Sequence, residues 1–378
     1  MAKFPIVSAD DHIDLQWLPP DLWTSRVPAS LRDRVPRVKG SAMGDMWYLG
    51  DQVLAPYGSP AMGGGLRSGL ERGEAVRQGE FRPTTPKLRL EDMARDGVSA
   101  SVMYGPVSPL ATSDPDIRQA CFRAYNEWLA DFCRAAPSQF VGVGLIPHDD
   151  PQQAAEEIYH LADLKLPEAA FLAARVPGPL FEAQWEPLWA AAEETGTIVG
   201  LHLGGGARTL TDQNRAASAA HMGTYLTIVQ MKMDEAIASV VMGGVLERHP
   251  GLKVVMAETG IGWLPYILQR MEHSFDRLKD SEASWQAKGG IPLTLRPTEY
   301  FRRQVWATFQ EDKAGIALLD WIGEERVMWA SDYPHPDGTW PDSQRVIQEQ
   351  FGDLSEATRR KILGGNARAL YNLPEGAA

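Results

Sequence analysis

The sequence predicts a (β/α)8 TIM barrel, an α/β fold, with an inserted lid-like region after its first strand. Eight short apolar runs are each followed by helical patterning, which predicts parallel strands, and eight such units favour a closed barrel. Three of these runs end in Asp or His. A doubly wound open sheet is the competing arrangement, but no Gly-x-Gly-x-x-Gly motif follows the first strand.

Strands and helices are expected to alternate along most of the chain. Short apolar runs bounded by turn residues are typical of buried strands, and longer amphipathic stretches are typical of helices. Strands are expected near residues 4–9, 99–104, 140–146, 169–173, 197–202, 253–257, 304–308 and 327–331. Helices are expected near residues 88–96, 114–135, 151–164, 185–194, 216–248, 264–278, 313–322 and 355–363.

Residues from about 18 to 86 interrupt this alternation, because they are dense in Pro and Gly. We expect an insertion packed over one end of the core, with a hairpin at about 46–53. A lid and a plain surface excursion both remain open for it. The whole chain, residues 1–378, would then form one barrel domain carrying this insertion.

The net charge of −12 argues against nucleic acid or an anionic membrane as the main partner. Cys121 and Cys133 are too few for a disulfide framework and suggest buried thiols in a reducing compartment. The first residues carry no signal-peptide pattern, and no apolar window is long enough to cross a bilayer. We therefore expect a soluble, cytoplasmic protein that acts on a small molecule.

Four strand-end side chains form a candidate metal site. Asp10 and His12 lie on the same side of the first strand, because the strand pleat repeats every two residues. His202 and Asp332 end two further strands, and all strand ends of a barrel meet at one face. Two imidazoles and two carboxylates suit one divalent ion, for which we expect Zn²⁺, with Mn²⁺ as the alternative.

Further candidates lie near other strand ends. Glu258 follows the strand at 253–257, and we expect it to be catalytic rather than part of a structural ion pair. His335 lies just past Asp332, where substrate contact and turn capping are both open. An aromatic pocket and a nearby helical histidine are the candidate substrate contacts, with a structural role open for each residue: Trp17, Tyr104, His221, Trp263 and Trp306.

Five segments together resemble the amidohydrolase superfamily: residues 8–12, 200–202, 246–255, 257–263 and 330–335. The similarity is greatest to its amidohydrolase-related branch, which includes aminocarboxymuconate semialdehyde decarboxylase and γ-resorcylate decarboxylase. This resemblance implies a metal-containing barrel with ligands at the ends of strands one, five and eight. By position these ligands are Asp10, His12, His202 and Asp332. Because branch members are often dimers, it also implies a homodimer.

The sequence departs from the family pattern at two positions. The first motif of the superfamily is commonly His-x-His, and here Asp10 replaces the first His. The decarboxylases have a His at the end of strand six, where this chain has Glu258. A buried glutamate with a raised pKa can handle a proton, but it also suits activation of a water. Glu258 therefore shifts the expectation toward hydrolysis.

We accordingly expect a hydrolase that acts on a small cyclic or aromatic acid, ester, lactone or amide through a metal-activated water. Asp332 or Glu258 would act as general base and then as acid. The alternative is a metal-dependent, non-oxidative decarboxylase of an aromatic or muconate-like acid, in which Glu258 or His335 protonates the ring carbon. A barrel that binds a ligand without turnover is the third hypothesis.

Overall fold

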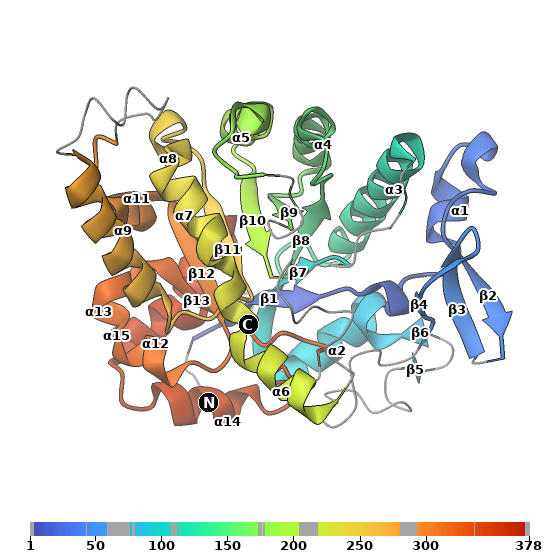
Figure 1. The fold of residues 1–378 in the computed structure, drawn as a ribbon. Coiled ribbons are helices and arrows are strands. Elements are labelled where there is room, and N and C mark those ends of the chain that lie inside the picture. Colours follow the sequence, from blue (N-terminus) through green and yellow to red (C-terminus); the bar gives the residue numbers. More distant parts are fainter. Residues whose placement is uncertain are drawn as a thin grey trace.

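The structure, a computed structural model, describes residues 4–42, 44–58, 76–77, 80–106, 112, 114–172, 176, 178–203, 218–279, 293–335 and 337–374. Its centre is an eight-stranded parallel sheet whose strand order follows the chain, as Figure 1 shows. The strands are β1 (Ile6–His12), β7 (Val98–Tyr104), β8 (Phe140–Leu145), β9 (Glu168–Phe171), β10 (Ile198–His202), β11 (Val254–Ala257), β12 (Val305–Phe309) and β13 (Val327–Trp329). The predicted (β/α)8 barrel is confirmed.

Backbone hydrogen bonds bring the last strand back to the first. The N–H of Asp332 donates to the carbonyl of Asp10 (3.0 Å), and the N–H of His12 donates to the carbonyl of Tyr333 (2.6 Å). These bonds join the carboxyl end of β1 to the segment that follows β13. Two of the predicted ligand segments are therefore neighbours through the closure of the barrel.

Helices occupy the connections between successive strands (Figure 1). They are α2 (Pro86–Asp96), α3 (Pro115–Cys133), α4 (Pro151–Leu164), α5 (Glu186–Thr195), α6 (Ala219–Ile228), α7 (Asp234–Met242), α8 (Val245–Arg248), α9 (Leu264–Lys279), α11 (Pro297–Gln304), α12 (Lys313–Ala317) and α13 (Leu319–Ile322). After β13 come α14 (Ser343–Phe351), α15 (Glu356–Arg360) and α16 (Asn366–Tyr371). Proline begins several of them, at the helix position where its missing N–H costs least.

Three helical stretches differ from the sequence expectation. The helix expected at 216–248 is divided into α6, α7 and α8. A 3-10 turn (Gln230–Met233) lies between the first two, and Gly244 takes a left-handed conformation (φ 75°) between the last two. The helix expected to end at residue 363 continues through a π turn at 361–365 into α16. There a Cβ on Gly364 would lie 2.6 Å from the carbonyl oxygen of Pro5, so this glycine allows close approach. Helix α14 was not expected.

The stretch between β1 and α2 contains α1 (Leu22–Arg26), a three-stranded antiparallel sheet and a short hairpin. The sheet comprises β2 (Arg37–Ser41), β3 (Gly44–Leu49) and β4 (Gln52–Pro56), so the expected hairpin at 46–53 is part of it. The hairpin pairs β5 (Val76–Arg77) with β6 (Glu80–Phe81). Residues 59–75 and 78–79 of the expected insertion lie outside the described residues. That residues 18–86 form an inserted lid stays a prediction.

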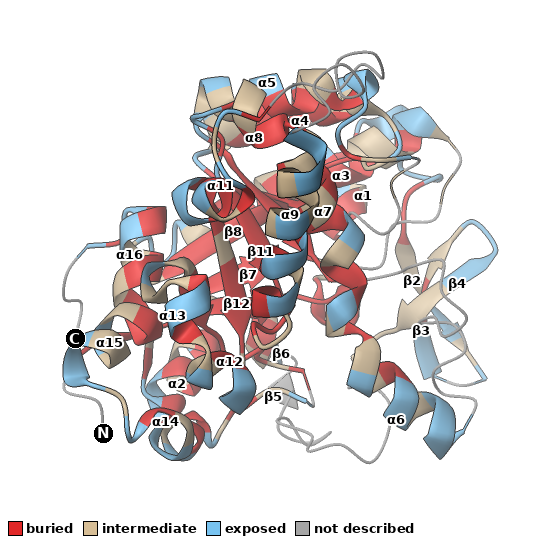
Figure 2. Ribbon diagram, turned by 60° about the vertical axis from the view of Figure 1, so that its left-hand side comes forward, coloured by how far each residue is buried: buried red, intermediate tan, exposed pale blue. Residues whose placement is uncertain are grey.

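Burial is concentrated in the barrel strands, whereas α6 and the β2–β4 sheet are largely exposed or partly exposed (Figure 2). All seven residues of β1 are buried, as are all five of β10. The polar side chains at the ends of these strands are therefore held within a packed interior. In the described parts of the chain, no helix is both long and apolar enough to cross a membrane.

Candidate metal centre

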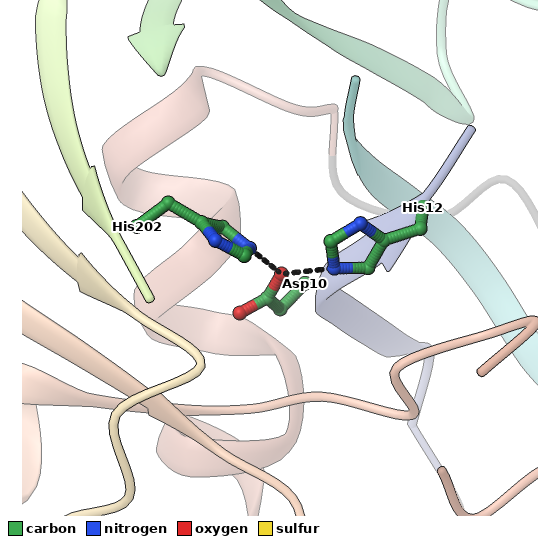
Figure 3. A group of neighbouring side chains, drawn as sticks. All are labelled: Asp10, His12 and His202. Carbon is green, nitrogen blue, oxygen red and sulfur yellow. Dashed lines mark ion pairs between the residues drawn. The ribbon is translucent and has the colours of Figure 1, made fainter. Parts of the chain in front are cut away.

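Three of the predicted ligands converge at one point of the barrel. Asp10 and His12 project from the end of β1, and His202 projects from the end of β10, as Figure 3 shows. Asp10 Oδ1 lies 3.7 Å from Nε2 of His12 and 3.6 Å from Nε2 of His202. The three ligand atoms are all within 4.8 Å of one another, and all three side chains are fully buried.

These buried atoms fit a cation. Within the described residues, Asp10 Oδ1, His12 Nε2 and His202 Nε2 have no hydrogen-bond partner, and leaving buried polar atoms unpaired is costly. Nδ1 of His202 hydrogen-bonds to the carbonyl of Leu203, which can only accept, so the lone pair of Nε2 faces Asp10. Burial, with the nearby charges of His335 and His202, holds the pKa of His12 well below its usual value, as a metal ligand requires.

Asp332 lies beside this group and contacts a further histidine, His335. Its Oδ1 is 3.4 Å from Nε2 of His12 and 2.9 Å from Nδ1 of His335. Nε2 of His335 in turn hydrogen-bonds to Asp14 at 3.1 Å, and its ring stacks on that of His12 with centroids 4.0 Å apart. Burial raises the pKa of Asp332. Burial opposes charging of His335, but Asp332 and Asp14 raise its pKa well above the usual value.

Glu258 also reaches the site, from the end of β11. Its Oε2 is 3.6 Å from Nε2 of His202 and 3.9 Å from Nε2 of His12. Burial, followed by the charge of Asp332, raises the pKa of Glu258 well above its usual value. Thr308 at the end of β12 connects this residue to Asp10, because its hydroxyl accepts the N–H of Glu258 (2.8 Å) and donates to Asp10 Oδ2 (2.7 Å).

Asp11, which alternates with the ligands on β1, anchors a buried network. Arg89 lies 3.5 Å from its carboxylate and donates to the carbonyl of His12 at 3.0 Å. The other donors to Asp11 come from β1, β7 and the segment after β13: Ser8, Ser101, Ser331 and the backbone of Tyr333. This network holds the backbone next to the predicted ligands His12 and Asp332.

Tyr104 packs against the ligands but directs its hydroxyl elsewhere. Its ring centroid is 4.7 Å from that of His202, and its hydroxyl donates to Glu168 at 2.5 Å. The other carboxyl oxygen of Glu168 accepts from Tyr371 on α16, also at 2.5 Å. Tyr104 therefore forms part of the packed surroundings of His202, and its role in substrate binding stays a prediction.

Two of the predicted tryptophans contact the residues that directly follow Asp332 and Glu258. Trp17 is buried in a small aromatic cluster with Tyr333 and Trp340, next to the Asp332 segment. Trp263 is partly buried and donates from its indole N–H to the carbonyl of Thr259 at 2.7 Å. Both residues therefore support the segments that carry site residues, and their contact with substrate stays a prediction.

The contacts of the last two candidates are with residues other than the predicted ligands. The guanidinium of Arg326, which precedes β13, is 4.4 Å from the ring centroid of Trp306, so this contact is at the opposite end of the strand from Asp332. His221 is exposed on α6, and its Nδ1 is 2.8 Å from the hydroxyl of Ser218. Substrate contact by Trp306 and His221 stays a prediction.

Sequence reasoning missed Asp14, Thr308 and Glu168. Asp14 continues the every-second-residue spacing of Asp10 and His12, and Thr308 ends a predicted strand, so both carried a signal. Glu168 begins its strand, and nothing local indicates that two tyrosines bury it.

A parallel (β/α)8 barrel with imidazoles and carboxylates converging at its strand ends defines a metal-binding barrel enzyme. The chain belongs to the amidohydrolase family, whose family model matches residues 23–373. It is 26% identical over 305 residues to 2-amino-3-carboxymuconate-6-semialdehyde decarboxylase of Dictyostelium discoideum, covering 80% of each chain. It is 26% identical over 276 residues to γ-resorcylate decarboxylase of Rhodococcus jostii, covering 66% of this chain and 76% of the relative.

Solved structures share the fold. An amidohydrolase of Mycobacterium avium subsp. paratuberculosis matches with a TM-score of 0.73 and 21% identity, covering 98% of this chain and 99% of that one. A dihydroxybenzoic acid decarboxylase of Polaromonas, with bound manganese and the inhibitor 2-nitroresorcinol, matches with a TM-score of 0.62 and 18% identity, covering 99% and 98%. The resemblance to the amidohydrolase-related branch is confirmed.

Proposed function

We propose that the protein is a metal-dependent, non-oxidative decarboxylase that removes CO2 from an aromatic or muconate-like acid. The observation that carries this proposal is that relatives named as decarboxylases match most of the chain, which presents a converging donor set at its strand ends. The sequence alone favoured hydrolysis, because Glu258 suits activation of a water. The relatives support the carboxy-lyase alternative better.

The donor set suits a divalent ion, which Asp10, His12, His202 and Asp332 would hold. When bound, the ion would supply positive charge that holds the substrate carboxylate and stabilises the negative charge left as CO2 departs. Manganese in the Polaromonas decarboxylase supports Mn²⁺ as the first ion to test, ahead of the Zn²⁺ expected from the ligand types.

The acid–base groups of the chain lie on the Asp332 side of the site. In the proposed reaction the bond between the substrate carbon and its carboxyl group breaks, CO2 leaves, and the same carbon takes up one proton. We assign this proton to Asp332, whose Oδ2 has no hydrogen-bond partner among the described residues. His335 and Asp14 behind it form a chain of close contacts along which a proton can be returned.

Product analysis in labelled water tests this proposal. The Mn²⁺-loaded protein is incubated with dihydroxybenzoates and aminocarboxymuconate semialdehyde in D2O and, separately, in ¹⁸O-water. Decarboxylation predicts CO2 release with one solvent deuterium on the carbon that lost the carboxyl group. Solvent ¹⁸O in the organic product without CO2 release would contradict it and support hydrolysis. His202→Ala should be inactive, whereas His273→Gln, at an exposed position of α9, is the matched control.

The assembly and the location belong to the same proposal. A homodimer and a cytoplasmic location stay predictions from the family resemblance and the composition. The substrate would in either case be a small molecule, because the site consists of buried side chains within the barrel.

A further inference from the structure

A cleft of about 750 Å³ lies at the amino end of β13, the end of this strand opposite to Asp332. It is bounded by residues of α11, α12, α13 and α15 and by the 3-10 turn Glu324–Arg326 that precedes β13. Figure 1 shows α12, α13 and α15 together on one side of the barrel. Small-molecule sites have volumes of about 300–1,000 Å³, so this cleft can hold a ligand away from the proposed metal centre.

Two arginines line the cleft and have no carboxylate partner among the described residues: Arg302 and Arg326. Nη2 of Arg302 donates to the backbone carbonyls of Asp320 (3.0 Å) and Trp321 (3.2 Å). The two arginine side chains are neighbours, because a Cβ on Gly323 would lie 3.8 Å from Nε of Arg302 and 3.9 Å from Cγ of Arg326. An anion in the cleft would therefore be within reach of two guanidinium groups.

Arg326 is the better oriented of these two cations. It is partly buried, and its guanidinium lies 4.4 Å from the ring centroid of Trp306. Burial lowers the pKa of Arg326, against the raising effect of Glu325. Removing a charged group from water without an ion pair is costly, and an anion would offset this cost. The contact with the indole ring restrains the guanidinium, which favours a defined geometry for a carboxylate.

Two of the three acidic side chains in the cleft are already paired. Glu324 and Glu325 both accept a hydrogen bond from Lys361, at 2.5 and 2.8 Å, and these bonds lower the pKa of both carboxyl groups. Asp320 is exposed and forms no ion pair in the part of the chain that the structure describes. The charges of the cleft therefore balance overall, and an anion would be held by direct contact with the guanidinium groups rather than by a net positive field.

Another part of the wall is apolar. Ile316, Leu319 and Leu354 line the cleft and belong to the hydrophobic core or pack against it. An inorganic anion would leave this apolar surface in contact with water. A carboxylate with an apolar body would cover it and contact the guanidinium groups as well.

We infer that this cleft binds a small organic carboxylate with an apolar body, whose carboxylate contacts Arg326 and Arg302. The site is separate from the proposed reaction centre, because the predicted metal ligands lie at the opposite strand ends. The inference therefore goes beyond the proposed function, and it holds whether or not the protein is a decarboxylase.

Isothermal titration calorimetry with 4-bromobenzoate tests the inference. The full-length chain is first treated with a chelator, so that no bound metal ion can hold the carboxylate. Arg326→Gln should raise the Kd by about tenfold or more, because a charge-assisted contact is lost, and Arg302→Gln, at an exposed position, should raise it less. Arg134→Gln, exposed at the end of α3, is the matched control and should bind as wild type does.

Three results would overturn the inference: no binding of 4-bromobenzoate to wild type, an unchanged Kd for Arg326→Gln, or phosphate binding as tightly as 4-bromobenzoate. A crystal of wild type soaked in 4-bromobenzoate gives an answer even if the variants do not fold. The anomalous signal of bromine should place the probe in the cleft, with its carboxylate about 2.7–2.9 Å from the guanidinium of Arg326. A probe that occupies only the strand ends around Asp10, or no site, contradicts the assignment.

Discussion

Glu168 is a buried carboxyl group with no cationic partner among the described residues, and its removal should change how stability depends on pH. It is fully buried at the start of β9, where its two oxygens accept hydrogen bonds from Tyr104 and Tyr371. Burial raises the pKa of Glu168 from 4.5 to about 8, against the lowering effect of the two tyrosine hydroxyls. Tyr104 also packs on His202, so one residue separates this carboxyl group from a predicted metal ligand.

The direction of this pH dependence follows from which state, folded or unfolded, binds the Glu168 proton. Between pH 4.5 and about 8 the folded protein keeps the Glu168 proton while the unfolded chain loses it, so the free energy of unfolding falls as pH rises. The fall is about 1.4 kcal/mol per pH unit, and the raised pKa corresponds to about 5 kcal/mol over the full range. Below pH 4.5 and above pH 8 this group adds no pH dependence.

Urea unfolding of wild type and Glu168→Gln at pH 5, 6, 7 and 8 measures this effect. Gln can accept from one tyrosine and donate to the other, and it cannot ionise. The variant should therefore gain stability relative to wild type by about 1.4 kcal/mol per pH unit across this range. Glu156→Gln, on the surface of α4, should show no such gain. If the difference in the free energy of unfolding between wild type and Glu168→Gln does not change with pH, Glu168 is not buried as a neutral group.

Three further predictions concern the metal and its surroundings. Mn²⁺ at about 100 times its Kd should stabilise the protein by about 2.7 kcal/mol. For 378 residues this corresponds to a rise in Tm of about 3 °C, measured by calorimetry. His202→Ala should abolish this rise. Arg89→Met should lower the free energy of urea unfolding by about 3–5 kcal/mol, because the Asp11 carboxylate loses its buried partner, and adding Asp11→Asn should restore part of that loss. Thr308→Val keeps the side-chain shape but removes the hydroxyl that donates a hydrogen bond to Asp10. Mn²⁺ titration should therefore show about 10- to 100-fold weaker binding. An unchanged Kd would exclude a positioning role for Thr308.

The convergence of the predicted ligand side chains could be predicted because their geometry follows from local rules. Asp10 and His12 share one side of a strand through the two-residue pleat, and a parallel barrel collects the ends of all its strands. Neither rule depends on how far apart the residues are in the sequence. The same rules placed His202 near Asp10, 192 positions away, as the structure has it.

Features that depend on distant partners were not predictable in this way. Glu168 is buried by Tyr371, a residue 203 positions later, and the interior position of Arg89 depends on Asp11 and the carbonyl of His12. The continuation of the last helix past residue 363 requires Gly364 to meet Pro5 at the other end of the chain. The reaction also could not be read from Glu258, because one glutamate suits proton transfer, water activation and metal binding alike.

The metal content of the purified protein tests the central claim most directly. Elemental mass spectrometry of wild type, His202→Ala and Asp10→Asn should give about one divalent ion per chain for wild type after Mn²⁺ loading and dialysis, and much less for both variants. CO2 release should follow the bound ion. A folded wild type that retains no ion after loading would contradict a metal-dependent site at these strand ends.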